Sequence, residues 1–309
     1  KRFEAFQGII GYLLHAYFEG KLKAAIFTDS RISEDASGRT GKTLIMKALG
    51  HMLNTNRVAK TYVEINGKDF DPANDKFKYQ SVGLDTKLIH INDAPRGINI
   101  ELMFNDITEG VSRQRKNEAP TQVYVKMALS TNRTIRIHGD SAKDRTIEFE
   151  MADYYSADWS PEKEFKQWFF RDWDKSEWNQ FDNFMLYCMK VYLNKGLAAP
   201  KTINLLLRKL QEETSVDFVK WMEEKKIQDG QRYPKKEMFG DFMREHTVDG
   251  YTDYKWLKQN RFTVWMRTYA EFHEDIEEMK EVRSNAIDFY EFKFKNRVEA
   301  IPEDLPDGW

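Results

Sequence analysis

The sequence predicts an α/β fold with a parallel five-stranded sheet flanked by helices, followed by a mostly helical region and a C-terminal winged-helix-like domain. Up to about residue 152, short apolar runs alternate with helical stretches. A polar loop that contains glycines follows the first of these runs and leads into a helix. Beyond residue 152, long amphipathic segments dominate. Alternating strands and helices are typical of a parallel sheet that is covered on both faces.

The first half of the chain contains all the strands expected in this sheet. A leading helix is expected at 4–19, within a segment that spans 1–23, because apolar side chains recur there at helical spacing. Residues 24–152 form the sheet segment. Its strand candidates are 24–27, 61–65, 87–91, 123–129 and 146–150, and a helix is expected at 43–53.

The second half is expected to be helical over 153–230 and winged-helix-like over 231–309. The expected helices are 162–172, 177–195, 202–213, 215–226, 235–246 and 254–273. Residues 287–294 alternate in polarity, which predicts a strand. Two helices followed by a strand form the outline of a small winged helix.

Composition excludes several classes of protein. The chain has 309 residues, of which 41% are hydrophobic, so we expect two or three folding units and not a disordered chain. Its 48 basic and 50 acidic residues nearly cancel, so contact with nucleic acid would need a local basic patch. Cys188 is the only cysteine, which excludes a disulfide framework and a cysteine-based zinc site. The short apolar runs predict no membrane span or signal peptide, so we expect an intracellular, cytoplasmic setting. Because the first residue is Lys and not Met, we also expect a piece of a longer chain.

The loop Gly38-Arg39-Thr40-Gly41-Lys42-Thr43 follows a strand candidate and opens a helix, where it can cradle phosphates. Backbone N–H groups in a glycine turn and at a helix N-terminus bind anions. Lys42 would reach the β- and γ-phosphates, and the Thr43 hydroxyl would bind Mg²⁺. Together with Leu44, these residues form the expected ATP-binding loop. The alternative is a chance Gly-Lys-Thr at a helix cap.

Polar residues also follow the later strands, where ligands gather in parallel sheets. Asn92 and Asp93 end one strand, and Asp93 can hold a metal ion or position the attacking water. Asn132 follows the next strand and could bind the γ-phosphate. Arg145 precedes the last strand and could reach a neighbouring subunit's γ-phosphate. Taken singly, these residues could equally belong to turns and a surface salt bridge.

A hairpin is expected within 111–129, with its tip near 117–120. Its first arm carries Arg113, Arg115 and Lys116 and no acid. In a ring of subunits, such hairpins would grip a single-stranded phosphate backbone without reading bases. The alternative is a charged strand edge that prevents aggregation.

In order and spacing, these motifs resemble those of superfamily 3 helicases, P-loop ATPases of the AAA+ type. The branch they are most similar to is the poxvirus- and phage-type primase-helicases of viruses, phages and mobile elements. The resemblance covers residues 5–152 motif by motif and the winged-helix-like tail more loosely. The motifs are residues 38–43, 90–93, 110–126, 130–132 and 144–150.

The resemblance implies a hexameric homo-oligomer that hydrolyses ATP with Mg²⁺ between subunits and moves 3′-to-5′ on single-stranded DNA. Asn132 would sense the γ-phosphate, and Arg145 would act on the neighbour's site. A primase or polymerase domain is implied in the same chain or complex, and the cytoplasm would be that of a host cell. Asn92 stands where the family has the first acid of a pair, and Ala36 replaces a loop glycine.

Two other functions stay open. A small-molecule P-loop kinase would share the first motif, but it would be monomeric and indifferent to DNA. A nucleotide-binding assembly scaffold would hydrolyse weakly and use its tail to dock DNA or partners. That tail carries Lys255, Lys258, Arg261 and Arg267 near its expected recognition helix, where Trp256, Phe262 and Trp265 are expected to be core residues.

Overall fold

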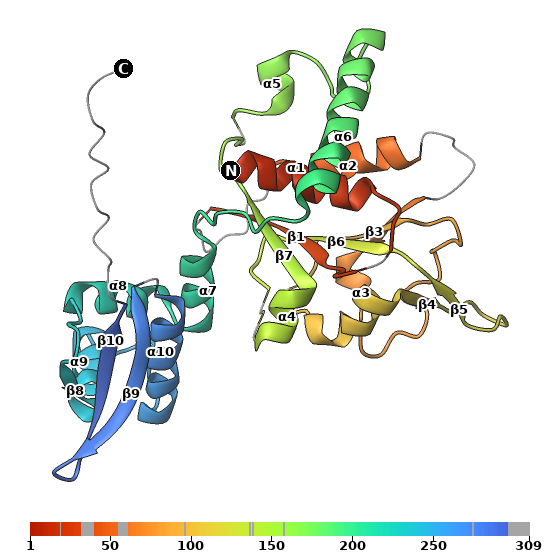
Figure 1. Cartoon of the computed structure of the whole chain (residues 1–309). Coiled ribbons are helices and arrows are strands. Elements are labelled where there is room, and N and C mark those ends of the chain that lie inside the picture. Colours follow the sequence, from red (N-terminus) through yellow and green to blue (C-terminus); the bar gives the residue numbers. More distant parts are fainter. Residues whose placement is uncertain are drawn as a thin grey trace, which may run out of the picture. The chain divides into compact units, whose positions relative to one another are not determined.

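The computed structural model describes residues 1–18, 20–31, 40–54, 61–95, 97–135, 137, 139–156, 158–273 and 275–295. The chain divides into two compact units, Lys1–Leu205 and Leu206–Trp309 (Figure 1). No helix among the described residues is long and apolar enough to cross a membrane.

The first unit is built on the predicted parallel five-stranded sheet. Its strands lie in the order β2-β3-β6-β1-β7, and every neighbouring pair is parallel. The strands are β1 Ala24–Asp29, β2 Tyr62–Asn66, β3 Leu88–Asn92, β6 Lys126–Ser130 and β7 Thr146–Met151. Because β3, β6 and β1 are consecutive in the sheet, their carboxyl ends lie side by side at one edge. This edge is where ligands bind in open parallel sheets.

Helices cover both faces of this sheet (Figure 1). On one face, Phe27 of β1 shares a core with Leu13, Leu49 and Cys188. These three come from helices α1 Arg2–Leu14, α2 Lys42–Leu53 and α6 Lys175–Lys195. The other face packs against η2 Ile100–Met103, α3 Phe104–Glu109 and neighbouring loops.

Helices α1 and α6 approach each other closely at Gly11. A Cβ atom on Gly11 would lie 2.0 Å from the carbonyl oxygen of Cys188, a distance that real atoms do not tolerate. At Gly8, one turn earlier, the nearest atom would be 3.2 Å away. The two helices can therefore cross this closely only because residue 11 is glycine, which has no side chain.

A buried lysine holds the C-terminal end of α1 against the sheet. Lys126, the first residue of β6, is 4% exposed and donates hydrogen bonds to the carbonyl oxygens of Tyr12 and His15, the former at 2.6 Å. A cation is favourable beside the carbonyl groups at a helix C-terminus. Burial lowers the pKa of Lys126 to about 8.

The rest of the first unit consists of short elements. They are β4 Val111–Arg113, β5 Thr121–Val123, α4 Gly139–Arg145 and α5 Pro161–Phe165. The strand expected at 123–129 is therefore divided, since Val123 pairs within the β4–β5 hairpin and β6 begins three residues later. The helix expected at 162–172 is wrong beyond Phe165, because Lys166 and Phe170 take positive φ angles. Aromatic rings, not helical turns, organise this stretch, and Phe170 packs on Trp173.

A buried carboxylate fixes the chain where the first unit ends. Glu150 of β7 is 2% exposed and accepts hydrogen bonds from the backbone N–H groups of Ile203 and Asn204. The Asn204 side chain donates to the carbonyl oxygen of Ser30 at 2.9 Å. Residues 203–204 are thus tied to the carboxyl ends of β7 and β1.

Within the described residues, the second unit is built from helices and three strands, and of these strands the sequence predicted only the one at 287–294. Its elements are α7 Leu205–Glu213, which begins at the boundary, α8 Val216–Lys225, β8 Arg232–Pro234, α9 Lys235–Glu245, α10 Gln259–Phe272, β9 Ile276–Ser284 and β10 Ile287–Phe294. The strands form an antiparallel sheet in the order β8-β10-β9. Phe262 and Trp265 are core residues, as expected. Trp256 is 59% exposed, so the expectation that it is buried was wrong, because it lies before α10, where its ring contacts those of Tyr254 and Trp265.

The compact units divide at residue 205, whereas the sequence placed limits at 152 and 230. The physical reason is that the helices between residues 152 and 230 belong to two different hydrophobic cores. Helix α6 contributes Met185 and Cys188 to the core beneath the sheet. Helix α8 contributes Phe218 and Trp221 to the core of the second unit.

Candidate nucleotide-binding site

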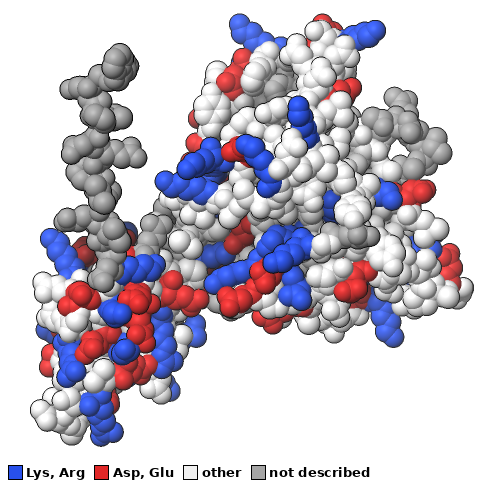
Figure 2. Space-filling view, viewed as in Figure 1, with Lys and Arg blue, Asp and Glu red and all other residues white. Residues whose placement is uncertain are grey.

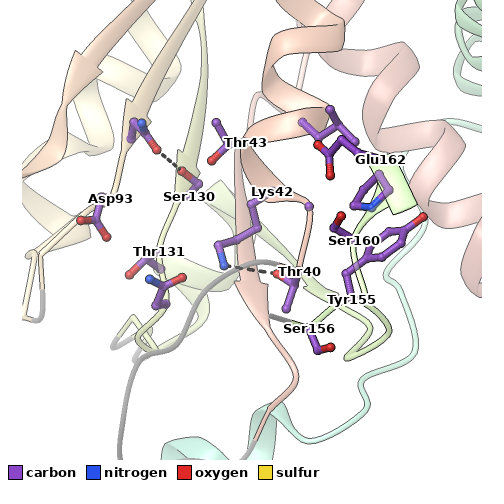
Figure 3. A pocket seen from close by; sticks show the side chains of 15 residues that line it. Thr40, Lys42, Thr43, Asp93, Ser130, Thr131, Tyr155, Ser156, Ser160 and Glu162 are labelled. Carbon is purple, nitrogen blue, oxygen red and sulfur yellow. Dashed lines mark hydrogen bonds between the residues drawn. The ribbon is translucent and has the colours of Figure 1, made fainter. Parts of the chain in front are cut away.

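A cavity of about 530 Å³ opens at the carboxyl edge of the parallel sheet (Figure 3). This volume lies within the range of roughly 300–1,000 Å³ that is usual for small-molecule sites. The lining residues come from the start of α2, the ends of β3 and β6, and the segment after β7. They are Thr40, Gly41, Lys42, Thr43, Leu44, Asn92, Asp93, Ser130, Thr131, Asn132, Tyr155, Ser156, Ser160, Pro161 and Glu162.

Helix α2 begins at the wall of this cavity. Gly41 precedes its first residue with φ +96°, a left-handed conformation that favours glycine. The first N–H groups of a helix have no partner within it, so they can bind an anion. Thr40 to Leu44, which the sequence places in the expected ATP-binding loop, line the cavity. Gly38 and Arg39, which the sequence also placed in that loop, lie outside the described residues.

The ammonium group of Lys42 is held by a carboxylate that the sequence reading missed. Lys42 is 8% exposed and forms an ion pair with Asp29, the last residue of β1, which is 5% exposed. The Thr40 hydroxyl donates to the same carboxylate and lies 3.4 Å from the Lys42 Nζ atom. The signal that could have revealed Asp29 is an acid two residues after the last apolar residue of a strand candidate.

Asn92 and Ser130 belong to a polar network that crosses three strands. The Ser130 hydroxyl donates to Asn92 Oδ1 at 3.0 Å, and Asn92 Nδ2 donates to Glu64 Oε1 at 2.9 Å. His90, which is fully buried, bonds to the Ser130 hydroxyl at 2.8 Å and to the Tyr62 hydroxyl at 2.9 Å. Hydrogen bonds from His90 and then from Asn92 lower the pKa of Glu64. Asn92 is therefore held in place by its neighbours on both sides.

Asp93 sits on a strained turn at the cavity wall. Its φ angle is +56°, a left-handed conformation that costs about 1–3 kcal/mol in non-glycine residues. Gly67 permits this turn, because a Cβ atom there would lie 2.6 Å from the carbonyl oxygen of Asn92. The Asp93 carboxylate is 47% exposed and lies 3.3 Å from the Lys68 Nζ atom. Such strain clusters at functional sites.

The end of β6 is locked to both neighbouring strands. The Thr131 N–H group donates to the carbonyl oxygen of Phe27, and its hydroxyl donates to that of Ala94 at 2.9 Å. Asn132 follows and lines the cavity. The predicted residues Lys42, Thr43, Asn92, Asp93 and Asn132 thus share one cavity.

The opposite wall comes from a segment that the sequence reading did not single out. Tyr155, Ser156, Ser160, Pro161 and Glu162 lie after β7 and at the start of α5. A Ser-Pro pair before a helix was the available signal, since serine caps helices and proline favours the first helical position.

Arg145 is not among the residues that line the cavity. It ends α4, where its Nη1 atom donates to the Ser141 hydroxyl at 2.7 Å. Its guanidinium group lies 5.0 Å from the ring centroid of Phe104. The arginine is therefore held on α4 and α3 of its own chain.

The β4–β5 hairpin forms where it was predicted, but two of its three cations make contacts inside the chain. Arg113 lies 3.8 Å from the Glu118 carboxylate, and Arg115 donates to the carbonyl oxygen of Gln80 at 3.0 Å. Lys116 is exposed. On the face shown in Figure 2, basic and acidic side chains are interspersed over both units.

In the second unit, Lys255 and Lys258 precede α10, and Arg261 is exposed on it. Arg267 forms an ion pair with Glu281. The basic residues that were expected near a recognition helix are thus spread over a turn and a helix.

No group of three or more His, Cys, Asp or Glu side chains within the described residues could by itself hold a metal ion. Mg²⁺ seldom needs such a group, because it is usually bound by one or two carboxylates together with substrate phosphates. Thr43 and Asp93, both at the cavity, are compatible with that mode.

No protein-family model matches the sequence, and no curated protein matches it. Among solved structures, the chain is similar to the apo A form of the NrS-1 C-terminal region, with 14% identity and a TM-score of 0.42. The alignment covers 93% of this chain and 70% of that one. A second structure of the same region gives 15% identity, a TM-score of 0.41 and the same coverage. Likeness at this level supports no statement about function.

Proposed function

We propose that the first unit binds and hydrolyses ATP, and that the protein is a ring-forming helicase or translocase that acts on single-stranded DNA. The observation that carries the first part is one cavity with a buried lysine at a helix N-terminus. Side chains from the ends of β3 and β6 line the same cavity. This combination suits an anionic ligand whose terminal group is to be cleaved.

Each group has a role in phosphoryl transfer to water. The N–H groups at the start of α2 and the Lys42 ammonium group bind the phosphates. The Thr43 hydroxyl and the Asp93 carboxylate would hold Mg²⁺, which neutralises charge on the phosphate oxygens. Asp93 also orients the attacking water, and the Asn132 amide contacts the γ-phosphate. The hydrogen bond that Asn92 accepts from Ser130 and the one that it donates to Glu64 keep Asn92 positioned beside these groups.

The placement of Arg145 outside its own chain's cavity supports a role in a neighbouring subunit. An arginine supplied in trans stabilises the charge of phosphoryl transfer and is worth about 10³–10⁵ in rate. The β4–β5 hairpins of such a ring would contact single-stranded DNA through Lys116. In this arrangement Arg113 and Arg115 would stiffen the hairpin through the contacts described above.

Mixing two inactive variants tests this proposal. Lys42→Ala and Arg145→Gln chains should each lose ATPase activity, and a mixture should recover part of it. Recovery is expected because an intact Lys42 site can then meet an intact Arg145 from its neighbour. Lys47→Ala, an exposed lysine on the same helix, is the matched control and should stay active. Full activity of Lys42→Ala would refute the site, and a mixture without recovery would refute the shared site.

A second candidate function, a nucleotide-binding scaffold with weak hydrolysis, is favoured by two observations. The residue beside Asp93 is the uncharged Asn92, and Asp29 already neutralises the ammonium group of Lys42. Rapid-mixing measurements of phosphate release distinguish the two functions. A scaffold binds ATP with little or no phosphate release and no response to DNA, whereas a translocase hydrolyses ATP faster when single-stranded DNA is added.

A further inference from the structure

The cavity has two ends of different chemistry, on either side of Lys42. Figure 3 shows Asp93 and Thr131 on one side of Lys42, with Tyr155, Ser160 and Glu162 on the other. The proposed function places the phosphates at Lys42 and α2. A single nucleotide bound there must then place its sugar and base along the other side.

The charge of Glu162 fixes this orientation. A hydrogen bond from Ser160, followed by one from its own backbone, lowers the pKa of Glu162, so the carboxylate is ionised at neutral pH. Among the described residues, no Lys or Arg forms an ion pair with Glu162, whereas Asp93 lies 3.3 Å from the Lys68 Nζ atom. A carboxylate without a paired cation repels phosphate groups, and its remaining lone pairs accept hydrogen bonds from hydroxyl or amino groups. Of the parts of a nucleotide, only the nucleoside offers such donors.

The side chains around Glu162 are already held in place. The Tyr155 hydroxyl donates to Glu164 at 2.7 Å, which fixes the aromatic ring at the cavity wall. The Ser160 hydroxyl accepts from the N–H group of Lys163 at 3.4 Å and so caps α5. A wall that needs no rearrangement binds its ligand without the entropic cost of ordering side chains.

We propose that Tyr155, Ser160 and Glu162 form the nucleoside end of this site, where Glu162 accepts hydrogen bonds from the ribose hydroxyls and the Tyr155 ring packs on the base. The inference rests on the proposed nucleotide site and adds a substrate class, namely ribonucleoside rather than 2′-deoxyribonucleoside triphosphates. An acidic side chain that bonds to ribose hydroxyls is a general way of recognising this sugar.

Competition binding against a fluorescent ATP analogue tests the inference on the whole chain. The competitors are ATP, 2′-deoxy-ATP and inorganic tripolyphosphate. Loss of a hydrogen bond to a charged group weakens binding about tenfold, so wild type should bind 2′-deoxy-ATP about tenfold more weakly than ATP. In Glu162→Gln this difference should fall to about twofold or less, while the affinity for tripolyphosphate is unchanged.

The control for lost charge is Asp158→Asn, an exposed acid of the same segment that does not line the cavity. It should keep the wild-type preference for ATP. Equal binding of ATP and 2′-deoxy-ATP by wild type, or an undiminished preference in Glu162→Gln, would overturn the inference while the phosphate site stands. If wild type binds none of the three competitors, the proposed nucleotide site itself fails, and this inference fails with it.

Discussion

The ion pair between Lys42 and Asp29 leads to a prediction about nucleotide affinity. Both side chains are nearly buried, and the ammonium group that the phosphates need is already bound to a carboxylate. A phosphate group that takes this ammonium must compete with Asp29. We therefore expect Asp29→Asn to bind ATP more tightly than wild type and to be less stable without it.

The magnitudes follow from the burial of the pair. Removing one partner of a buried ion pair costs about 3–5 kcal/mol, because the other charge is left without compensation. Lys42 lines a cavity that water can enter, so the loss of folding stability in Asp29→Asn should lie near or below the lower end of this range. A bound triphosphate restores an anion beside Lys42. If it recovers about 1.4 kcal/mol of this loss, the affinity for ATP rises about tenfold.

Thermal unfolding with and without a non-hydrolysable ATP analogue, together with equilibrium binding, measures both effects. The matched control is Asp153→Asn, which loses the same charge near the end of β7, where Asp153 pairs with Arg31 and not with Lys42. Its affinity for nucleotide should stay within about twofold of wild type, as expected of an exposed ion pair. Equal or weaker binding by Asp29→Asn would refute the reasoning, since it would mean that Asp29 aims Lys42 at the phosphates.

Three further predictions concern stability and turnover. Gly11→Ala should lose about 1–3 kcal/mol in urea unfolding, because its Cβ would lie 2.0 Å from the Cys188 carbonyl oxygen, whereas Gly8→Ala should be nearly neutral; equal stabilities would contradict the close crossing. Burial lowers the pKa of Lys126 to about 8 from 10.5. Between those pH values the unfolded chain therefore binds one more proton than the folded chain. The free energy of unfolding then rises with pH, by at most about 3 kcal/mol. That rise should be missing from Lys126→Met when the two are compared by urea unfolding at pH 8 and 10.5, and parallel pH profiles would show that the residue is not desolvated. Asp93→Asn suits the left-handed turn and should fold normally, yet lose about 10²–10⁴ in ATPase rate; normal turnover would remove Asp93 from the mechanism.

The sheet could be predicted from sequence because each strand is a short apolar run that ends in polar residues. Residues 87–91 were expected as a strand, and β3 spans Leu88–Asn92. Once the strands are parallel, the residues that follow them must gather at one edge, so Lys42, Asp93 and Asn132 could be placed together in advance.

The remaining parts of the site depend on tertiary contacts that their local sequence signals do not specify. Strand β1 continues beyond its apolar run because Thr28 and Asp29 pair with Glu150 and Met151 of β7. Only that pairing brings the Asp29 carboxylate to Lys42. Likewise, Glu162 lines the same cavity as Lys42, although more than a hundred residues of the chain separate the two.

The cations of the hairpin show the same limit. Their charge and spacing could be read from the sequence, but the groups that they contact could not. Arg115 donates to the carbonyl oxygens of Gln80 and Val82, two groups that every residue possesses and that no pattern marks. A cluster of basic residues therefore identifies a candidate surface, whereas the contacts decide how many of its charges face outward.

The anchoring of Ile203 and Asn204 on Glu150 has a mechanical consequence. Asn204 also donates a hydrogen bond to Ser30, the residue next to Asp29. The chain is therefore attached to the ends of β7 and β1, beside the cavity, immediately before residue 205. Tension in the chain that follows is delivered to β1 and β7, and not to the long helix α6. A truncation that removes 203–204 would leave a buried carboxylate without its two backbone donors, so a separately expressed first unit must extend past this point.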